Sequence, residues 1–79
     1  MNKFKSKRKE SLEKRKRNFD FKIGELKKVT EGLIATLRTL DDPKLQRELE
    51  EQLAKYNIRA AATEIRLIKT TRRLSREFN

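Results

Sequence analysis

The sequence has no cysteine, no histidine and no tryptophan, and only one proline and two glycines among its 79 residues. Without cysteine, the chain has no disulfide framework, no thiolate zinc site and no thiol nucleophile. The absence of histidine also removes the most common general base and the imidazole metal ligand. We therefore expect neither an enzyme nor a protein that holds a metal ion or another cofactor.

Long apolar runs are missing as well. No segment approaches the ~20 apolar residues that a helix needs to cross a membrane, and the basic N-terminal segment lacks the apolar core of a signal peptide. We expect a soluble cytoplasmic protein, associated with the nucleoid or a ribonucleoprotein if it binds nucleic acid. Glu, Lys, Arg, Leu and Ala are abundant while helix breakers are scarce, which favours long helices over sheet.

Apolar residues recur every three or four positions in two halves of the chain, which is the heptad pattern of packed helices. The halves meet at Asp42-Pro43, because aspartate caps the N–H groups at a helix start and proline fits the first turn. A connection at 41–42 is short enough to force antiparallel neighbours. The first stripe contains Phe19, Ile23, Leu26, Thr30, Leu33, Leu37 and Leu40, and the second contains Leu45, Leu49, Leu53, Tyr56, Ala60, Thr63, Leu67 and Leu74.

The two stripes match each other as an antiparallel hairpin. In such a hairpin, the numbers of facing residues add to a nearly constant value. Leu37 and Leu49 add to 86, and five further pairs along the two stripes do the same. The sequence thus predicts an all-α fold, a long coiled-coil-like helical hairpin over 11–79, preceded by a flexible basic arm over 1–10.

Positive charge is concentrated near the two chain ends. Residues 1–18 carry a net charge of +7 and residues 59–79 a net charge of +4, whereas residues 19–58 sum to −1. A hairpin folded at 41–42 brings both ends together, so one tip of the rod carries about +11. Such a tip suggests an anionic partner, most simply the phosphate backbone of structured RNA or duplex DNA.

Two groups of cations are the candidate nucleic-acid contacts. The N-terminal run is denser than a solvated helix face requires, and a solubilising tail is its alternative interpretation. The second group follows a ridge of the second helix, where arginine forks suit bidentate phosphate contacts; its alternative role is to stabilise the helix C-terminus. The groups are Lys5, Lys7, Arg8, Lys9, Lys14, Arg15, Lys16 and Arg17, and Arg59, Arg66, Lys69, Arg72, Arg73 and Arg76.

The second helix also carries an apolar face that one hairpin cannot bury. Ile58 and Ile65 lie two residues from Ala60 and Leu67, about 200° around the helix. We expect a homodimer that forms a four-helix bundle, and a permanent partner protein is the alternative. The candidate interface residues are Val29, Ile34, Ile58, Ala62, Ile65 and Ile68.

Together these features predict a small basic accessory or regulatory protein that binds nucleic acid through the charged open end of the hairpin. The alternative function is a protein-binding adaptor or inhibitor that docks on a host or partner protein through the second apolar face. Attachment to anionic membranes ranks third, because the basic N-terminal helix has a weak apolar face. No small-molecule substrate is expected.

Overall fold

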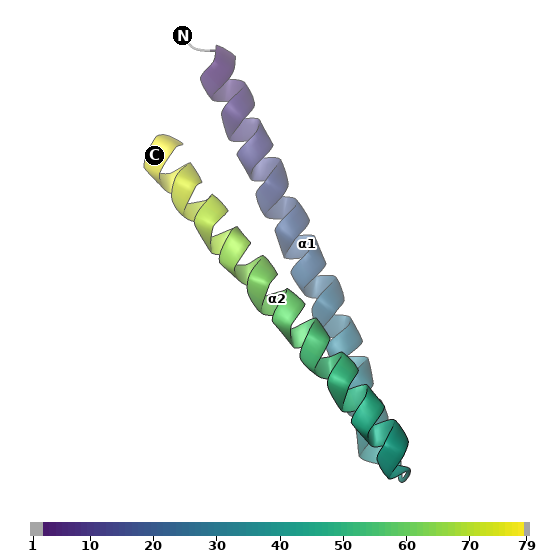
Figure 1. Ribbon diagram of the computed structural model, residues 1–79. Coiled ribbons are helices and arrows are strands. Elements are labelled where there is room, and N and C mark those ends of the chain that lie inside the picture. Colours follow the sequence, from purple (N-terminus) through teal and green to yellow (C-terminus); the bar gives the residue numbers. More distant parts are fainter. Residues whose placement is uncertain (1–2, 79) are drawn as a thin grey trace.

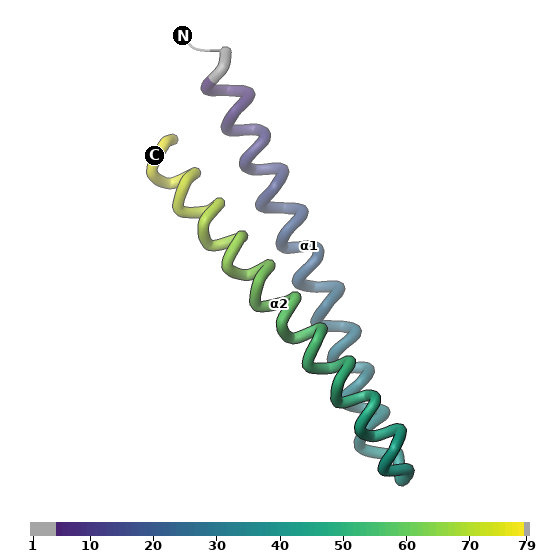
Figure 2. Tube along the Cα trace, in the orientation of Figure 1, coloured from purple at the N-terminus to yellow at the C-terminus, as the bar shows by residue number. Residues whose placement is uncertain are grey.

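The protein, described over residues 3–78 by a computed structural model, is an antiparallel hairpin of two helices (Figure 1). Helix α1 runs over Lys3–Thr39 and helix α2 over Pro43–Phe78. The Cα trace follows both helices without interruption to one tight connection (Figure 2). The hairpin measures 63 × 15 × 14 Å, so it is a rod only two helices wide. The predicted all-α hairpin is confirmed.

The connection between the helices forms as the Asp-Pro pair predicts. The Lys44 backbone N–H donates a 2.9 Å hydrogen bond to Asp42 Oδ1, which is the N-cap geometry of a helix start. Pro43 is the first helical residue, where a missing N–H removes no helical hydrogen bond. α1 ends at Thr39, and only residues 40–42 link the helices.

The predicted apolar stripes form the interface between α1 and α2, which we call the seam. Among the side chains described over 5–78, Leu12 and Ile23 are the buried apolar ones, with 4% and 8% exposure. Apart from Leu45, the other members of the two stripes are half-buried or buried. Thr63 is 9% exposed, and its hydroxyl donates to the Arg59 carbonyl at 2.8 Å, so this polar group in the seam is satisfied.

The seam differs from the prediction beside the turn. Leu45 is 45% exposed, and the half-buried residue at this level of α2 is Gln46. The Gln46 side-chain amide donates to the Leu40 carbonyl, which lies at the end of α1 where carbonyls lack helical partners. The placement of Leu45 in the seam is therefore wrong, because satisfying that carbonyl turns Gln46 inward.

The open end of the hairpin is held together more firmly than its sparse apolar pattern predicts. Leu12 is the most buried apolar side chain described, and Leu74 and Phe78 of α2 are half-buried. Arg8 then donates two hydrogen bonds to Glu77, from Nε to Oε2 and from Nη2 to Oε1, both 2.8 Å long. Bidentate pairs of this kind are the strongest surface ion pairs, so this one ties α1 to the last turn of α2.

The predicted basic arm over 1–10 lies within α1 from Lys3 onward. Because Arg8 pairs with Glu77, residues 3–7 extend beyond the described end of α2 (Figure 1). They form more than one helical turn at the tip of the rod. Met1 and Asn2 lie outside the described residues, and the flexibility of the arm stays a prediction.

The two glycines of α1 offer a test of how much backbone freedom limits the hairpin's stability. Both are exposed, and a Cβ added to either would meet no atom within 4 Å. Gly24→Ala and Gly32→Ala should each raise the free energy of unfolding by about 0.5–1 kcal/mol, because alanine loses less backbone entropy in a helix. Urea denaturation followed by circular dichroism measures the change.

Ala35→Gly is the matched control for these substitutions, since Ala35 is exposed on the same helix. It should lower the free energy of unfolding by a similar amount. If both glycine substitutions instead destabilised the protein, another chain would have to pack against the glycines.

Candidate nucleic-acid interface

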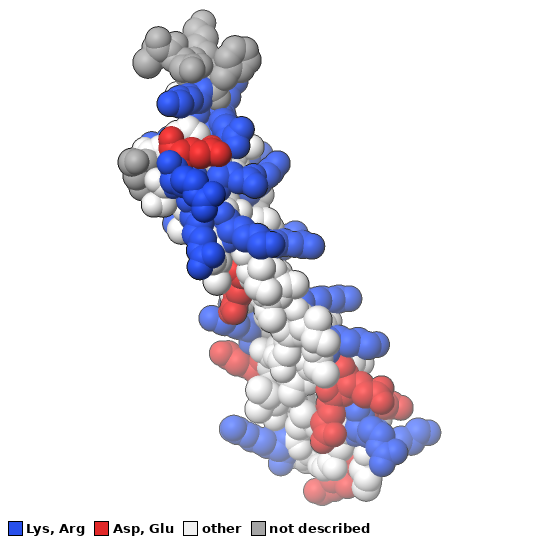
Figure 3. Space-filling model, turned by 60° about the vertical axis from the view of Figure 1, so that its left-hand side comes forward, with Lys and Arg blue, Asp and Glu red and all other residues white. Residues whose placement is uncertain are grey.

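Lys and Arg side chains crowd the open end of the hairpin, whereas acidic and basic side chains are mixed near the turn (Figure 3). Between these regions an uncharged strip runs along the middle of the visible face, with charged side chains at its edges. The fold alone produces this distribution, because the turn at 40–42 brings the two basic ends of the chain to one end of the rod.

The two sides of the seam carry different charges. A row of residues at seven-residue spacing borders the seam on each side. We call one side the basic flank and the other the mixed flank. The basic flank has Arg8, Arg15 and Lys22 on α1 and Arg59, Arg66 and Arg73 on α2; the mixed flank has Glu13, Asp20 and Lys27 on α1 and Asn57, Glu64 and Thr71 on α2.

The basic flank is hollowed along the seam in two places that follow each other towards the open end. We call the two hollows together the basic groove. Six cations line it, three from each helix, and Glu25 is its one carboxylate. The first hollow is lined by Phe21, Lys22, Glu25, Leu26, Arg59, Ala62, Thr63 and Arg66, and the second by Arg8, Ser11, Leu12, Arg15 and Arg73.

The cations of the basic groove have few acidic partners. Among the side chains described over 5–78, the ion pairs within 4.0 Å are Arg8–Glu77 and Lys28–Glu25. Five of the six groove cations are therefore outside any such pair. Packed helices gain stability when opposite charges border their seam, and like charges there destabilise them. Helix packing alone thus does not explain this groove.

Two groove arginines are held in place by neighbouring side chains. The Arg59 guanidinium carbon lies 5.6 Å from the centre of the Tyr56 ring, within the range of a cation–π interaction. Arg8 is fixed by Glu77. Along α2, the arginines at 59, 66 and 73 repeat every ~10.5 Å, so their ridge covers about 21 Å. That length matches about six base pairs of duplex at ~3.4 Å each.

The structure brings five of the fourteen predicted contact residues into the basic groove: Arg8, Arg15, Arg59, Arg66 and Arg73. Lys69 and Arg76 lie on the same helix, each three residues after an arginine of the ridge. Arg72 lies on the outer side of α2, near the exposed isoleucines.

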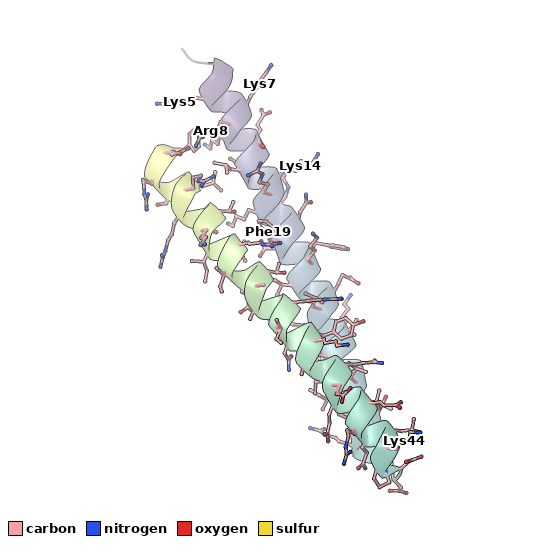
Figure 4. The ribbon with its side chains drawn as sticks, viewed as in Figure 1. Lys5, Lys7, Arg8, Lys14, Phe19 and Lys44 are labelled. Carbon is pink, nitrogen blue, oxygen red and sulfur yellow. The ribbon has the colours of Figure 1, made fainter. Side chains whose placement is uncertain are left out.

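The remaining candidates on α1 point in several directions. A hollow on the mixed flank is lined by Lys9, Lys16 and Arg17, together with Glu13, Leu74 and Phe78. Lys7 and Lys14 project away from α2, whereas Arg8 points towards its end (Figure 4). Lys5 lies on the extension of α1 beyond α2. The N-terminal run is therefore a cluster of charge around the tip, and only part of it faces the groove.

Lys22 is a groove residue that the sequence prediction missed. Its signal was present, because Arg8, Arg15 and Lys22 repeat at heptad spacing on α1 in the same way as the arginines on α2. Phe21 also lines the groove and is 69% exposed. An exposed aromatic ring among cations suits stacking on a base or sugar.

The predicted interface residues occupy three different places. Ile58, Ile65 and Ile68 are 69%, 54% and 50% exposed on the outer face of α2. Ala62 lines the basic groove. Val29 and Ile34, with 40% and 39% exposure, border the seam on opposite flanks of α1.

No protein-family model, curated protein or solved structure matches the chain. Among the described residues, no group of three carboxylates lies close enough together to hold a metal ion. Neither helix, over its described length, is long and apolar enough to cross a membrane. The function is therefore inferred from the geometry and charge of the hairpin.

The repulsion within the groove can be measured directly. Arg66→Gln should raise the free energy of unfolding by about 0.2–0.5 kcal/mol in low salt, because it removes a charge beside Lys22 and Arg59. The gain should disappear between about 10 mM and about 1 M salt, as the Debye length shortens from about 30 Å to about 3 Å. Urea denaturation at both salt concentrations gives the two values.

Lys55→Gln is the control, because Lys55 lies four residues after Glu51 and outside the groove. It should leave stability unchanged or reduce it slightly. A loss of stability in Arg66→Gln at low salt would contradict the view that the groove cations repel one another.

Proposed function

We propose that this is a small nucleic-acid-binding accessory or regulatory protein, which contacts the phosphate backbone of structured RNA or duplex DNA through the basic groove. The observation that supports it is the set of six cations, contributed by two helices, around a single carboxylate. Phosphates would neutralise the five of these cations that are outside ion pairs and release condensed counterions, which is the main source of sequence-independent affinity. Binding would also remove the repulsion that the isolated hairpin carries.

The groove and the tip of the rod would contact different phosphates. The arginine ridge on α2 would follow one stretch of backbone, with each guanidinium able to hold a phosphate by two hydrogen bonds. Lys5 and Lys7, beyond the described end of α2, would contact phosphates farther along the strand. Backbone contacts position a protein without reading sequence, so we propose selection by shape.

The exposed isoleucines of α2 support two further proposals. A homodimer is the proposed binding unit, because no described side chain of this two-helix rod is fully buried and a large apolar face stays uncovered. The same face favours a second candidate function, in which the protein docks on a host or partner protein as an adaptor or inhibitor. In either case we propose a cytoplasmic site of action.

The test of the proposed function is the affinity for a fluorescent DNA duplex and a fluorescent RNA hairpin across a salt series. Replacing Arg59, Arg66 and Arg73 together by glutamine should weaken binding at least tenfold near physiological salt. It should also reduce the slope of log affinity against log salt by about 2.7 for duplex DNA, since each phosphate contact contributes about 0.9. A preference for one ligand would identify the partner class.

The matched control replaces Lys44, Arg47 and Lys55 by glutamine. These three cations also lie on α2 and are exposed, but they are outside the groove, and the net charge changes equally. Under the proposal the control loses much less affinity than the groove variant. Equal losses in the two variants, or weak binding that vanishes by about 150 mM salt, would reject the groove as a specific site.

A further inference from the structure

The outer face of α2 carries a second apolar stripe, which we call the outer seam. Its members are spaced by four, three, four and three residues, the same heptad rhythm as the seam that joins α1 and α2. All of them are exposed in the hairpin. The outer seam consists of Ala54, Ile58, Ala61, Ile65 and Ile68.

We propose that the outer seam binds the outer seam of a second copy of this chain, with the two α2 helices antiparallel and a two-fold axis beside Ala61. The stripe is complementary to itself in this arrangement. Ile58 would face the partner's Ile65, and Ala54 would face the partner's Ile68. At the axis, Ala61 meets the partner's Ala61, where two small side chains let the helices approach closely.

The charges on either side of the outer seam select this antiparallel direction. Three carboxylates, Glu48, Glu50 and Glu51, lie in the first half of α2, where they balance the nearby cations, whereas the second half is basic. In the antiparallel pair, Glu51 faces the partner's Arg72, and Glu48 lies beside the partner's Arg76. A parallel pair would instead place Arg72 against the partner's Arg72. The like-charged contact between Lys55 and the partner's Lys69 occurs twice by symmetry, and it is outweighed by the two kinds of attractive pair, which also occur twice.

The shape of the dimer decides how its two basic grooves are oriented. The importance of that orientation rests on the proposed nucleic-acid binding. The outer seam lies about 200° around α2 from α1, so the four helices form a flat row and not a square bundle. The two-fold axis stands perpendicular to the row. It therefore places both basic grooves on the same face, with Arg66 and the partner's Arg66 about 15 Å apart along the rod.

Cysteine cross-linking tests the pairing, because the chain has no cysteine of its own. Ala61→Cys should form a disulfide-linked dimer readily under mild oxidation, since the two thiols meet at the axis. Ala54→Cys lies on the same face, but its two copies would be about 21 Å apart, too far for a disulfide, which needs Cα atoms within about 7 Å. Non-reducing electrophoresis measures the linked fraction, and circular dichroism confirms that both variants are helical.

Charge reversal tests the direction independently. Glu51→Arg and Arg72→Glu should each raise the dimer dissociation constant about fivefold or more in sedimentation measurements, and the double variant should recover most of the lost affinity. Glu31→Arg, an exposed charge reversal on α1, is the control and should have little effect. Failure of the double variant to recover would reject this register.

Three results would overturn the proposal: equal cross-linking of the two cysteine variants, no cross-linking of Ala61→Cys, or a monomer at every concentration measured. The proposed function is judged separately by nucleic-acid affinity. Efficient cross-linking of Ala61→Cys in a protein that binds no nucleic acid would support the dimer and reject the function. Nucleic-acid binding by a protein that stays monomeric would support the proposed function and reject the dimer.

Discussion

The apolar seam between α1 and α2 fixes the position of every other feature of this protein. Its register, in which facing residue numbers add to about 86, agrees with the two contacts that bridge the helices at opposite ends of the rod. These are the Gln46 amide on the Leu40 carbonyl and the Arg8 pair with Glu77. This same register sets the basic residues of α1 across from the arginines of α2. The hydrophobic pattern therefore decides where the charge gathers.

The energies involved explain how the hairpin tolerates its basic groove. Burying one leucine or isoleucine contributes about 1.5–3 kcal/mol when burial is complete, and the seam has more than a dozen members, most of them half-buried. A like-charged pair on neighbouring helical positions costs only about 0.2–0.5 kcal/mol and weakens in salt. The seam can therefore hold cations together in an arrangement that is unfavourable until an anion occupies it.

The all-α hairpin and its turn could be predicted from the sequence, because heptad spacing and the Asp42-Pro43 pair are local signals. The position of Leu45 could not be predicted in that way. Gln46 replaces Leu45 in the seam because a carbonyl at the end of α1 needs a donor, which hydrophobicity does not encode. Leu12 follows the predicted register, since Leu12 and Leu74 add to 86, although how deeply it is buried depends on the tertiary structure of the open end. The heptad spacing of Lys22 from Arg8 and Arg15 was a sequence signal that the prediction missed.

The most direct test of the central claim compares two lysines on α1 in the unmodified protein. Lys22 lines the basic groove, whereas Lys27 lies about 140° around the helix on the mixed flank, and both are exposed. Their rates of acetylation, measured by mass spectrometry with and without saturating duplex DNA or hairpin RNA, should diverge. We predict strong protection of Lys22 and little protection of Lys27. Equal protection of the two, or preferential protection of Lys27, would show that nucleic acid does not occupy the groove.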